Sequence, residues 1–466
     1  MNFRSILSYL GLMLVILAIL MLLPIAVSWI FAEDIYLPFL LGSIISFITG
    51  IALYKRLERE PLDLGSAMVL AGVTFITISL FGSIAYLDHL EPVDSLFESV
   101  SGFTTTGLTV VNPESLPHAV LFWRSLTQWV GGVGIIVIFL LLMSSPGMSS
   151  YYLYRAEGRT QRIEAGIYST VKRIFIIYGI YTIIGIALLS LAGMPLFDSV
   201  AHTFTSLSTG GFSVKSGSIG SYSNPVVELV MVLLMILGAT SFFIHDKMFK
   251  RNFMEYIRNS ESQLFWSLVV IFSIFLSLSF LSLPGSLRLG IFHAFSALTT
   301  TGYTLGMQTY PELSKFLIII LMIIGGFAGS TAGGLKLVRV GILGKAVNWV
   351  SKKISYPRSA VVPLKFHGKI VSEEELGIIS LFSFVYILIL VASTLIFSFM
   401  GYAPLDSFFV SASAEGTVGL TTIDIATVNP LGKFVLMVCM LLGRLEILPF
   451  LVIFYSIFAG IRRRVQ

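Results

Sequence analysis

The sequence predicts an all-α polytopic membrane protein, in which an N-terminal transmembrane hairpin precedes four pseudo-symmetric helix–pore loop–helix repeats around one pore. Three observations support this prediction: the composition, ten long apolar runs and a four-fold internal repeat. Of the 466 residues, 56% are hydrophobic and 12% are charged, and the mean hydropathy is +0.91. Soluble domains carry about 25% charged residues, and disordered chains have low hydrophobicity, so both classes are excluded.

A helix needs roughly 20 mainly apolar residues to cross a bilayer, and the apolar runs of the sequence are candidate crossings by this measure. The first run has no clean small-residue cleavage site, so it is interpreted as an anchor rather than a signal peptide. Ten crossings would place both termini on the same side of the membrane. The expected crossings are Ile6–Ile30, Leu37–Leu53, Ser66–Leu87, Val120–Met143, Ile174–Leu191, Val226–Phe243, Leu264–Leu283, Phe316–Ile324 with a broken continuation, Ile378–Met400 and Phe434–Phe458.

The distribution of lysine and arginine predicts the orientation, because cytoplasmic loops carry an excess of both. Most basic residues fall on the side of the two termini, and the other side offers only Lys215, Arg288, Lys315 and Lys433. Both termini are therefore expected in the cytoplasm of a multi-pass protein of the cell (inner or plasma) membrane. The outer loops carry acids that would concentrate cations, although outer loops also simply avoid basic residues. The basic residues are not gathered on one domain, so the net charge of +5 does not predict a nucleic-acid partner.

Four segments align without gaps and form an internal repeat. They read FESVSGFTTTGLTV (97–110), AHTFTSLSTGGFSV (201–214), FHAFSALTTTGYTL (292–305) and FVSASAEGTVGLTT (409–422). One column is always glycine, with threonine two positions earlier and threonine or serine two positions later. Chance repetition would not preserve a single column four times, so we interpret these segments as copies of one structural unit. The glycines are Gly107, Gly211, Gly302 and Gly419.

Each unit is expected to contain a helix, a short re-entrant helix, an extended loop and a second helix. A proline follows each glycine and should begin the second crossing, because proline is tolerated in the first helical turn. These prolines are Pro113, Pro225, Pro311 and Pro430. Three copies carry an Asp-Ser pair (Asp94-Ser95, Asp198-Ser199 and Asp406-Ser407), which is expected to cap the short helix. The predicted boundaries are 1–62 for the hairpin and 63–170, 171–259, 260–370 and 371–466 for the repeats.

A Thr-x-Gly-x-Thr segment at membrane depth favours cation binding. Non-helical backbone survives there only where it is buried in protein or lines a water-filled cavity. Four extended loops around one axis can turn their carbonyl oxygens inward and replace the hydration shell of a cation. Glycine allows the required backbone angles, and the short helices would direct their negative C-terminal ends at the ion. The alternative is that such segments are ordinary loops or small-residue packing patches.

The second crossing of the third repeat is interrupted by a glycine-rich stretch, Gly325–Gly334. Glycine costs about 1 kcal/mol relative to alanine inside a helix, so this stretch is expected to unwind and to face the pore or bury against protein. The spacing of Gly325, Gly329 and Gly333 also suits close helix packing, and the residues alone leave both interpretations open. A phosphate-binding loop is excluded, because Lys336 is followed by Leu337 rather than serine or threonine.

Two arginines inside apolar runs are candidate functional residues. Arg444 lies about 15 residues after Pro430, or roughly 20 Å along a helix. A fixed positive charge there would restrict cation passage, although a structural pair with Glu446 or another acid is the alternative. Arg124 is expected to be structural and to share a polar face with Gln128. Lys336 is expected to anchor the glycine-rich stretch to carbonyl groups or to an acid.

Other kinds of site are not supported by the sequence. His202 and His293 share a repeat column, but the equivalent positions hold Glu98 and Val410, so metal ligation is not expected. The single cysteine, Cys439, excludes a cysteine-based cluster. No paired nucleophile and base stand at depth, so an enzyme is not expected, and no arginine ladder suggests a voltage sensor.

Several strings resemble the TrkH/TrkG/KtrB superfamily of potassium transport subunits over nearly the whole chain. They are TTTGLT and TTTGYT, FWRSLTQWVGGVGI (122–135), GGFAGSTAGGLK (325–336) and GRLE (443–446), and the N-terminal hairpin is similar to the TrkH branch. The resemblance implies one potassium pore per subunit, a homodimer, and a cytoplasmic nucleotide-binding regulatory partner of the RCK type, similar to TrkA. It implies K⁺ as the transported ion and no cofactor in this chain. The basic loops at 155–172, 247–258 and 336–369 suit such a partner, or anionic lipid.

The resemblance also implies roles for individual residues. The expected filter comprises Thr105, Thr106, Gly107, Leu108, Thr209, Gly210, Gly211, Phe212, Thr300, Thr301, Gly302, Tyr303, Thr417, Val418, Gly419 and Leu420. Serine in place of the first glycine is associated with sodium transport in the superfamily, so Gly107 favours potassium. Gly416 replaces a threonine in the fourth copy, so imperfect symmetry is expected. The expected gate comprises Gly325, Gly326, Gly329, Ser330, Thr331, Gly333, Gly334, Lys336 and Arg444.

Two transport mechanisms follow from these expectations. The first is a potassium-selective conducting subunit that is gated by the glycine-rich loop and by the regulatory partner. The second is a secondary active symporter coupled to sodium or protons. The symporter would need an acid at mid-membrane depth, and the only deep candidate in the sequence, Glu446, is expected to lie below that depth.

Overall fold

The computed structural model describes residues 3–57, 60–134, 166–306, 309–357, 362–366, 368–446 and 449–452. The regular structure of these residues is helical, apart from a two-stranded antiparallel sheet of β1 (Leu364–Phe366) and β2 (Lys369–Val371). Six helical spans are long and apolar enough to cross a membrane, and a pair of helices bent by 106° could form a seventh. The described residues therefore confirm the predicted all-α class, and the count of ten crossings stays a prediction.

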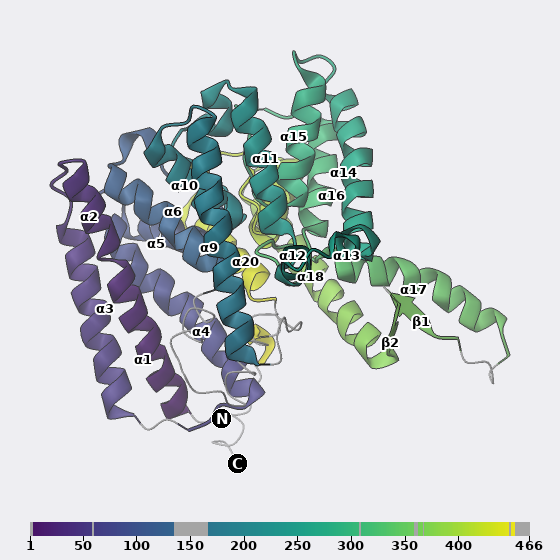
Figure 1. Ribbon diagram of the computed structural model, residues 1–466, viewed down its shortest axis with the longest axis horizontal. Coiled ribbons are helices and arrows are strands. Elements are labelled where there is room, and N and C mark those ends of the chain that lie inside the picture. The colour runs from purple at the N-terminus through teal and green to yellow at the C-terminus, as the bar shows by residue number, and fades with distance from the viewer. Residues whose placement is uncertain are drawn as a thin grey trace.

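The N-terminal hairpin consists of α1 (Phe3–Leu20), α2 (Leu23–Ile30) and α3 (Leu37–Arg56), and stands at one side of the molecule (Figure 1). Helices α1 and α3 touch closely where two glycines face each other, since a Cβ on Gly50 would lie 2.6 Å from the Gly11 carbonyl oxygen. Helices α1 and α2 together form one candidate span, Phe3–Ile30, which agrees with the expected crossing Ile6–Ile30, and the helix is broken at Met21–Leu22. Proline 24 sits in the first turn of α2, and its missing N–H explains why the chain restarts a helix there.

The first two repeats follow the hairpin. The first contains α4 (Leu64–Gly82), η1 (Ser83–Tyr86), α5 (Pro92–Phe103), η2 (Pro113–Ser115) and α6 (His118–Val133). The second contains α9 (Ile167–Leu191), α10 (Leu196–Leu207), η3 (Ser218–Tyr222), α11 (Pro225–Ala239), α12 (Phe242–Phe249) and α13 (Phe253–Arg258).

The last two repeats have the same order of a long helix, a short helix and a second helix. The third contains α14 (Ser260–Ser279), α15 (Ser286–Leu298), α16 (Glu312–Ile324), α17 (Leu337–Ser355) and the small sheet. The fourth contains α18 (Glu373–Phe399), α19 (Pro404–Glu415), η4 (Ile425–Thr427) and α20 (Pro430–Arg444). In Figure 1, α17 and the sheet project away from the main body of helices.

Two second helices are broken rather than continuous. The expected crossing Val226–Phe243 is wrong as a single helix, because α11 ends at Ala239 and α12 departs at 106°. Helix α16 ends at Ile324, and no helix resumes until Leu337, as the glycine content predicts. The two interrupted regions contact each other through two hydrogen bonds. The Phe327 N–H donates to the Ala239 carbonyl (3.1 Å), and the Phe242 N–H donates to the Gly329 carbonyl (3.2 Å). Residues 135–143 of the crossing Val120–Met143, residues 447–448 and 453–458 of the crossing Phe434–Phe458, and residues 155–165 of the basic loop 155–172 lie outside the described residues.

The ends of the helices correct two sequence predictions. Prolines 225, 311 and 430 stand at the starts of second helices, but Pro113 begins the short η2 turn, and α6 begins after Pro117. The Asp-Ser pairs do not cap the short helices, because α5 and α19 begin two residues before the aspartate, at a proline that fits the first turn. The serine hydroxyls instead donate to carbonyl groups that precede the helix, as Ser95 does to Leu90 (3.1 Å).

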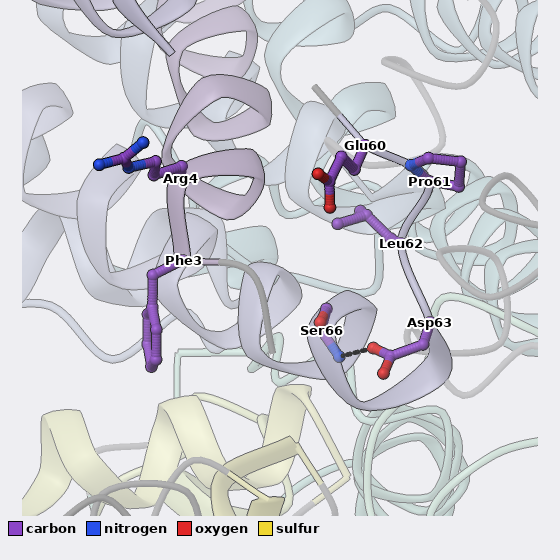
Figure 2. A pocket seen from close by; sticks show the side chains of 7 residues that line it. All are labelled: Phe3, Arg4, Glu60, Pro61, Leu62, Asp63 and Ser66. Carbon is purple, nitrogen blue, oxygen red and sulfur yellow. Dashed lines mark hydrogen bonds between the residues drawn. The ribbon is translucent and has the colours of Figure 1, made fainter. Parts of the chain in front are cut away.

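Helix α4 carries a true side-chain cap, which lies beside an open pocket at the ends of α1 and α4. The Asp63 carboxylate accepts a hydrogen bond from the Ser66 N–H (2.7 Å), as Figure 2 shows, and hydrogen bonding from the Ser66 side chain and then from this N–H holds the pKa of Asp63 below its ordinary value. The pocket has a volume of about 610 Å³ and is lined by Phe3, Arg4, Glu60, Pro61, Leu62, Asp63 and Ser66. None of the repeated Thr-x-Gly segments contributes to this pocket.

Candidate functional site

The four short helices α5, α10, α15 and α19 end in the same unusual way. In each, the threonine two residues before the repeat glycine has a left-handed backbone, with φ of 54°, 54°, 55° and 50° at Thr105, Thr209, Thr300 and Thr417. The next N–H closes the turn by bonding five residues back, as Thr106 does to the Ser101 carbonyl (2.9 Å). This is the Schellman ending, which normally places glycine at the left-handed position. A β-branched residue there is a strained exception, repeated four times.

The repeat glycines form a closed ring. Their φ angles are 88°, 74°, 80° and 94°, which only glycine adopts readily. A Cβ on Gly107 would collide with the Gly210 carbonyl oxygen of the second repeat, and the same collision recurs from each repeat to the next and from the fourth back to the first. The oxygens involved belong to Thr106, Gly210, Thr301 and Val418, and we call these four oxygens together with the four glycines the glycine ring.

The ring exposes backbone and hides side chains. In all four copies the glycine is partly accessible, whereas the residues immediately before and after it are buried. The side chains that follow the glycines are turned into the protein, and Leu108 and Tyr303 are 0% exposed. The hydroxyl-bearing residues two positions after each glycine, such as Thr109 and Thr304, are again partly accessible. The accessible surface of the ring is therefore made of main-chain atoms.

This geometry can bind a dehydrated monovalent cation. Carbonyl oxygens carry partial negative charge without a formal charge, so they can replace water ligands and still release the ion. The C-terminal ends of the four short helices lie next to the ring and add negative potential. Among the described residues no group of three histidine, cysteine, aspartate or glutamate side chains could hold a metal ion.

The glycine-rich stretch 325–336 lies directly against the threonines of the ring. The Gly333 N–H donates to the Thr300 hydroxyl (2.9 Å), and the Thr209 hydroxyl donates to the Thr331 hydroxyl (3.2 Å). A Cβ on Gly333 would collide with the Thr417 hydroxyl oxygen. Three of the four left-handed threonines therefore touch this segment, which we call the intramembrane loop.

The second and third repeats also hold the intramembrane loop. The Thr331 hydroxyl lies 2.9 Å from the Gly238 carbonyl oxygen of α11 and 3.0 Å from the Leu207 carbonyl oxygen at the end of α10. The buried carboxylate of Glu261, at the start of α14, accepts the Ala328 N–H (2.9 Å). The loop is thus satisfied by protein groups, as non-helical backbone in a membrane requires.

Arg444 and Lys336 fix the loop from the side of the fourth repeat. Arg444 donates to the Thr331 carbonyl (2.8 Å) and to the carbonyls of Gly131 and Gly132 at the end of α6. Lys336 forms an ion pair with Glu446 (2.5 Å), which also pairs with Arg339. The structure therefore places an acid beside Lys336, one of the two alternatives for this residue, and joins Arg444 to the loop itself.

Ion pairs connect neighbouring repeats at three of the four junctions among the described residues. Lys433 of the fourth repeat pairs with Asp94 of the first (2.6 Å), and Lys315 of the third pairs with Asp406 of the fourth (2.9 Å). Between the second and third repeats the polarity is reversed, since Glu228 pairs with Arg288. Asp198 accepts the Tyr222 hydroxyl (2.6 Å). Asp94 and Asp406, two acids on the side expected to be the outer one, therefore join neighbouring repeats, whereas Asp198 bonds within the second repeat.

Two functional candidates escaped the sequence analysis. Gln128 was assigned only a shared polar face with Arg124, but its amide contacts the ring backbone at Gly210 and Phe212. Glu415 ends α19 with 0% exposure, and neither carboxylate oxygen has a hydrogen-bond partner among the described residues. The equivalent residues in the other repeats are apolar (Phe103, Leu207 and Leu298). An acid in an otherwise apolar column of the repeat alignment could therefore have identified Glu415 from the sequence.

The fold and the ring define a class of protein: a polytopic helical membrane protein with a central ring of re-entrant backbone, whose carbonyl oxygens have the chemistry to bind a cation. Comparison with known proteins agrees with this class. The sequence profile of the TrkH family, described as a cation transport protein, matches residues 38–459. The chain belongs to the TrkH family, whose members are transporters and not enzymes.

Individual relatives match nearly the full chain. An uncharacterized cation transporter of Methanocaldococcus jannaschii is 34% identical, over 98% of this chain and 96% of its own length. The Trk system potassium uptake protein TrkG of Escherichia coli is 32% identical, over 94% and 95% of the two chains. The crystal structure of the potassium transporter TrkH from Vibrio parahaemolyticus superposes with a TM-score of 0.87 at 29% identity, covering 97% of this chain and 98% of that one.

The closed ring predicts that added carbon atoms block it. Gly302→Ala places a Cβ against the Val418 carbonyl and forces alanine into a left-handed backbone, which costs roughly 1–2 kcal/mol. We expect rubidium uptake by proteoliposomes to fall at least about tenfold. Gly344→Ala is the control, because a Cβ there meets no atom within 4 Å. Equal uptake by both variants would show that Gly302 does not border the ion path.

Proposed function

We propose that this chain is the potassium-selective, ion-conducting subunit of a Trk-type uptake system. The observation that carries the proposal is the glycine ring, in which each glycine leaves room for a carbonyl oxygen of the next repeat. The relatives named Trk system potassium uptake proteins support potassium as the ion. The expected filter residues are those of the four Thr-x-Gly-x segments, and the glycine at position 107 favours potassium over sodium.

We propose further that the intramembrane loop is the gate. It touches Thr209, Thr300 and Thr417 from one side of the ring, so an ion leaving the ring on that side meets the loop. Arg444 adds a positive charge bonded to the loop carbonyl of Thr331. Opening would require the loop to leave the ring, and the hydrogen bonds of Arg444 and Glu261 oppose that movement.

The proposal includes the assembly and orientation expected from the sequence. The subunit would form a homodimer, with both termini in the cytoplasm of the cell membrane, and a nucleotide-binding regulatory partner of the RCK type would dock on the cytoplasmic face. The projection of α17 and the small sheet from the helical body gives a partner an accessible element (Figure 1). Lysines 345, 352 and 353 on α17 supply positive charge for a partner or for anionic lipid.

A change at Gly107 tests the filter. Gly107→Ser adds a side chain where a Cβ would meet the Gly210 carbonyl, and the altered ring should discriminate less between ions. We expect the potassium-to-sodium flux ratio of purified protein in liposomes to fall about tenfold, which corresponds to about 1.4 kcal/mol. An unchanged ratio in a protein that still conducts would remove the first repeat from the filter.

A change at Arg444 tests the gate. Arg444→Ala deletes charged hydrogen bonds to the loop and the α6 carbonyls, each worth about 1.5–3 kcal/mol. The open population, and therefore potassium flux, should rise at least about tenfold. Arg444→Lys keeps the charge and should give a smaller rise, whereas the exposed Arg258→Ala should have no effect. Lower flux in a variant of unchanged thermal stability would contradict the proposed gate.

A second candidate function is proton- or sodium-coupled potassium symport, and Glu415 is the observation that favours it. The carboxyl group is buried at the end of α19, two residues before Thr417 of the fourth filter segment. Glu446, the acid expected from the sequence, is instead bound to Lys336 and Arg339. If Glu415 couples transport, a potassium gradient should drive proton or sodium movement in the wild type and not in Glu415→Gln. Potassium flux without any coupled ion in the wild type would exclude symport.

A further inference from the structure

The second repeat lacks a side chain where the other three have one. The residue before the ring glycine is Thr106, Thr301 or Val418 in three repeats, and Gly210 in the second. Two consecutive glycines, Gly210 and Gly211, make this segment the one with the greatest intrinsic backbone freedom. Something outside the segment must therefore hold the Gly210 carbonyl in the ring.

Gln128 of α6, in the first repeat, fills the vacant space. A Cβ on Gly210 would collide with the carboxamide of Gln128, which is itself 0% exposed. The Gln128 Nε2 donates to the Gly210 carbonyl oxygen (2.7 Å), and its Oε1 accepts the Phe212 N–H (3.0 Å). One side chain thus holds the backbone on both sides of Gly211.

Arg124, one helical turn before Gln128, extends this contact. Its guanidinium lies 4.1 Å from the centroid of the Phe212 ring and donates to the Ser213 carbonyl (3.1 Å). Its remaining donors bind Glu98 (2.7 Å) and the Thr109 hydroxyl (3.1 Å) of the first repeat. The ion pair with Glu98 is buried on both sides, so the residues that hold the second filter segment are themselves fixed.

Gln128 also makes the four ring oxygens unequal. Among the hydrogen bonds of the described residues, those to the ring oxygens reach Gly210 alone. An oxygen that already accepts a bond from an amide offers less electron density to an ion, and its position is tied to α6. Three of the ring oxygens therefore accept no hydrogen bond from the described residues, and the fourth, of Gly210, would be shared between Gln128 and an ion.

We propose that Gln128 is a positioning residue that sets the place of the Gly210 carbonyl oxygen and thereby the ion selectivity of the ring. This inference rests on the proposed function, since selectivity has meaning only if the ring is the filter. It goes beyond that function because it assigns discrimination between ions to a side chain outside the repeated segments. The other repeats contribute the equivalent bulk through their own Thr or Val side chains, so the role of Gln128 is specific to the second repeat.

A double-mutant cycle in proteoliposomes tests the proposal through the potassium-to-sodium flux ratio. Gln128→Ala frees Gly210, and Gly210→Thr collides with Gln128, so each single change should lower the ratio about tenfold. The pair Gln128→Ala/Gly210→Thr gives the second repeat the side chain of the first and third repeats. It should restore the ratio to within about threefold of the wild type, because the two effects compensate rather than add.

Controls separate this proposal from the function on which it rests. Ser125→Ala removes another buried polar group of α6, one whose hydroxyl donates to the Leu121 carbonyl of the same helix, and should leave the ratio unchanged. Gln128→Met keeps the length and bulk of the side chain but provides neither hydrogen bond, so it should lower the flux ratio as Gln128→Ala does. It serves as the test if Gln128→Ala fails to fold. If Gly107→Ser alters selectivity and the Gln128 variants do not, the present inference is wrong. If neither does, the proposed filter is wrong.

Discussion

The structure depends on one constraint: backbone that leaves the helical state inside a membrane needs partners other than water. The four extended segments meet this constraint by converging, so that each ring glycine accommodates a carbonyl oxygen from the neighbouring repeat. Convergence in turn requires four helices that end abruptly and send the chain back toward the axis. The left-handed threonines make that turn, and the packing around them must compensate for their strain.

The sequence predicted the residues of the ring better than their conformations. Columns of glycine and threonine were visible because they recur at one spacing, and the break of α16 followed from its glycines. The left-handed threonines were not predicted, because local preference argues against that conformation for a β-branched residue. Helix starts were misplaced where two prolines compete, as Pro113 and Pro117 do. The contacts of Gln128 with the ring and of Arg444 with the intramembrane loop join residues distant in the sequence, which local patterns do not encode.

Four sequence copies do not produce four equal structural units. Gln128 substitutes for a side chain in the second repeat, an intramembrane loop interrupts the third, and a buried acid ends the short helix of the fourth. Even the ion pairs between repeats reverse polarity at one junction. Four converging carbonyl oxygens suit the binding of one ion, and under the proposed function the unequal surroundings would allow the repeats to divide selectivity, gating and support among themselves.

The most direct measurement of the central claim is the position of a heavy alkali ion in crystals of this protein. In crystals grown with rubidium, the account predicts anomalous density on the axis of the glycine ring, within reach of the carbonyl oxygens of Thr106, Gly210, Thr301 and Val418. Exchange of rubidium for sodium should abolish that density. Rubidium density found only elsewhere, with the ring empty at saturating rubidium, would contradict the account.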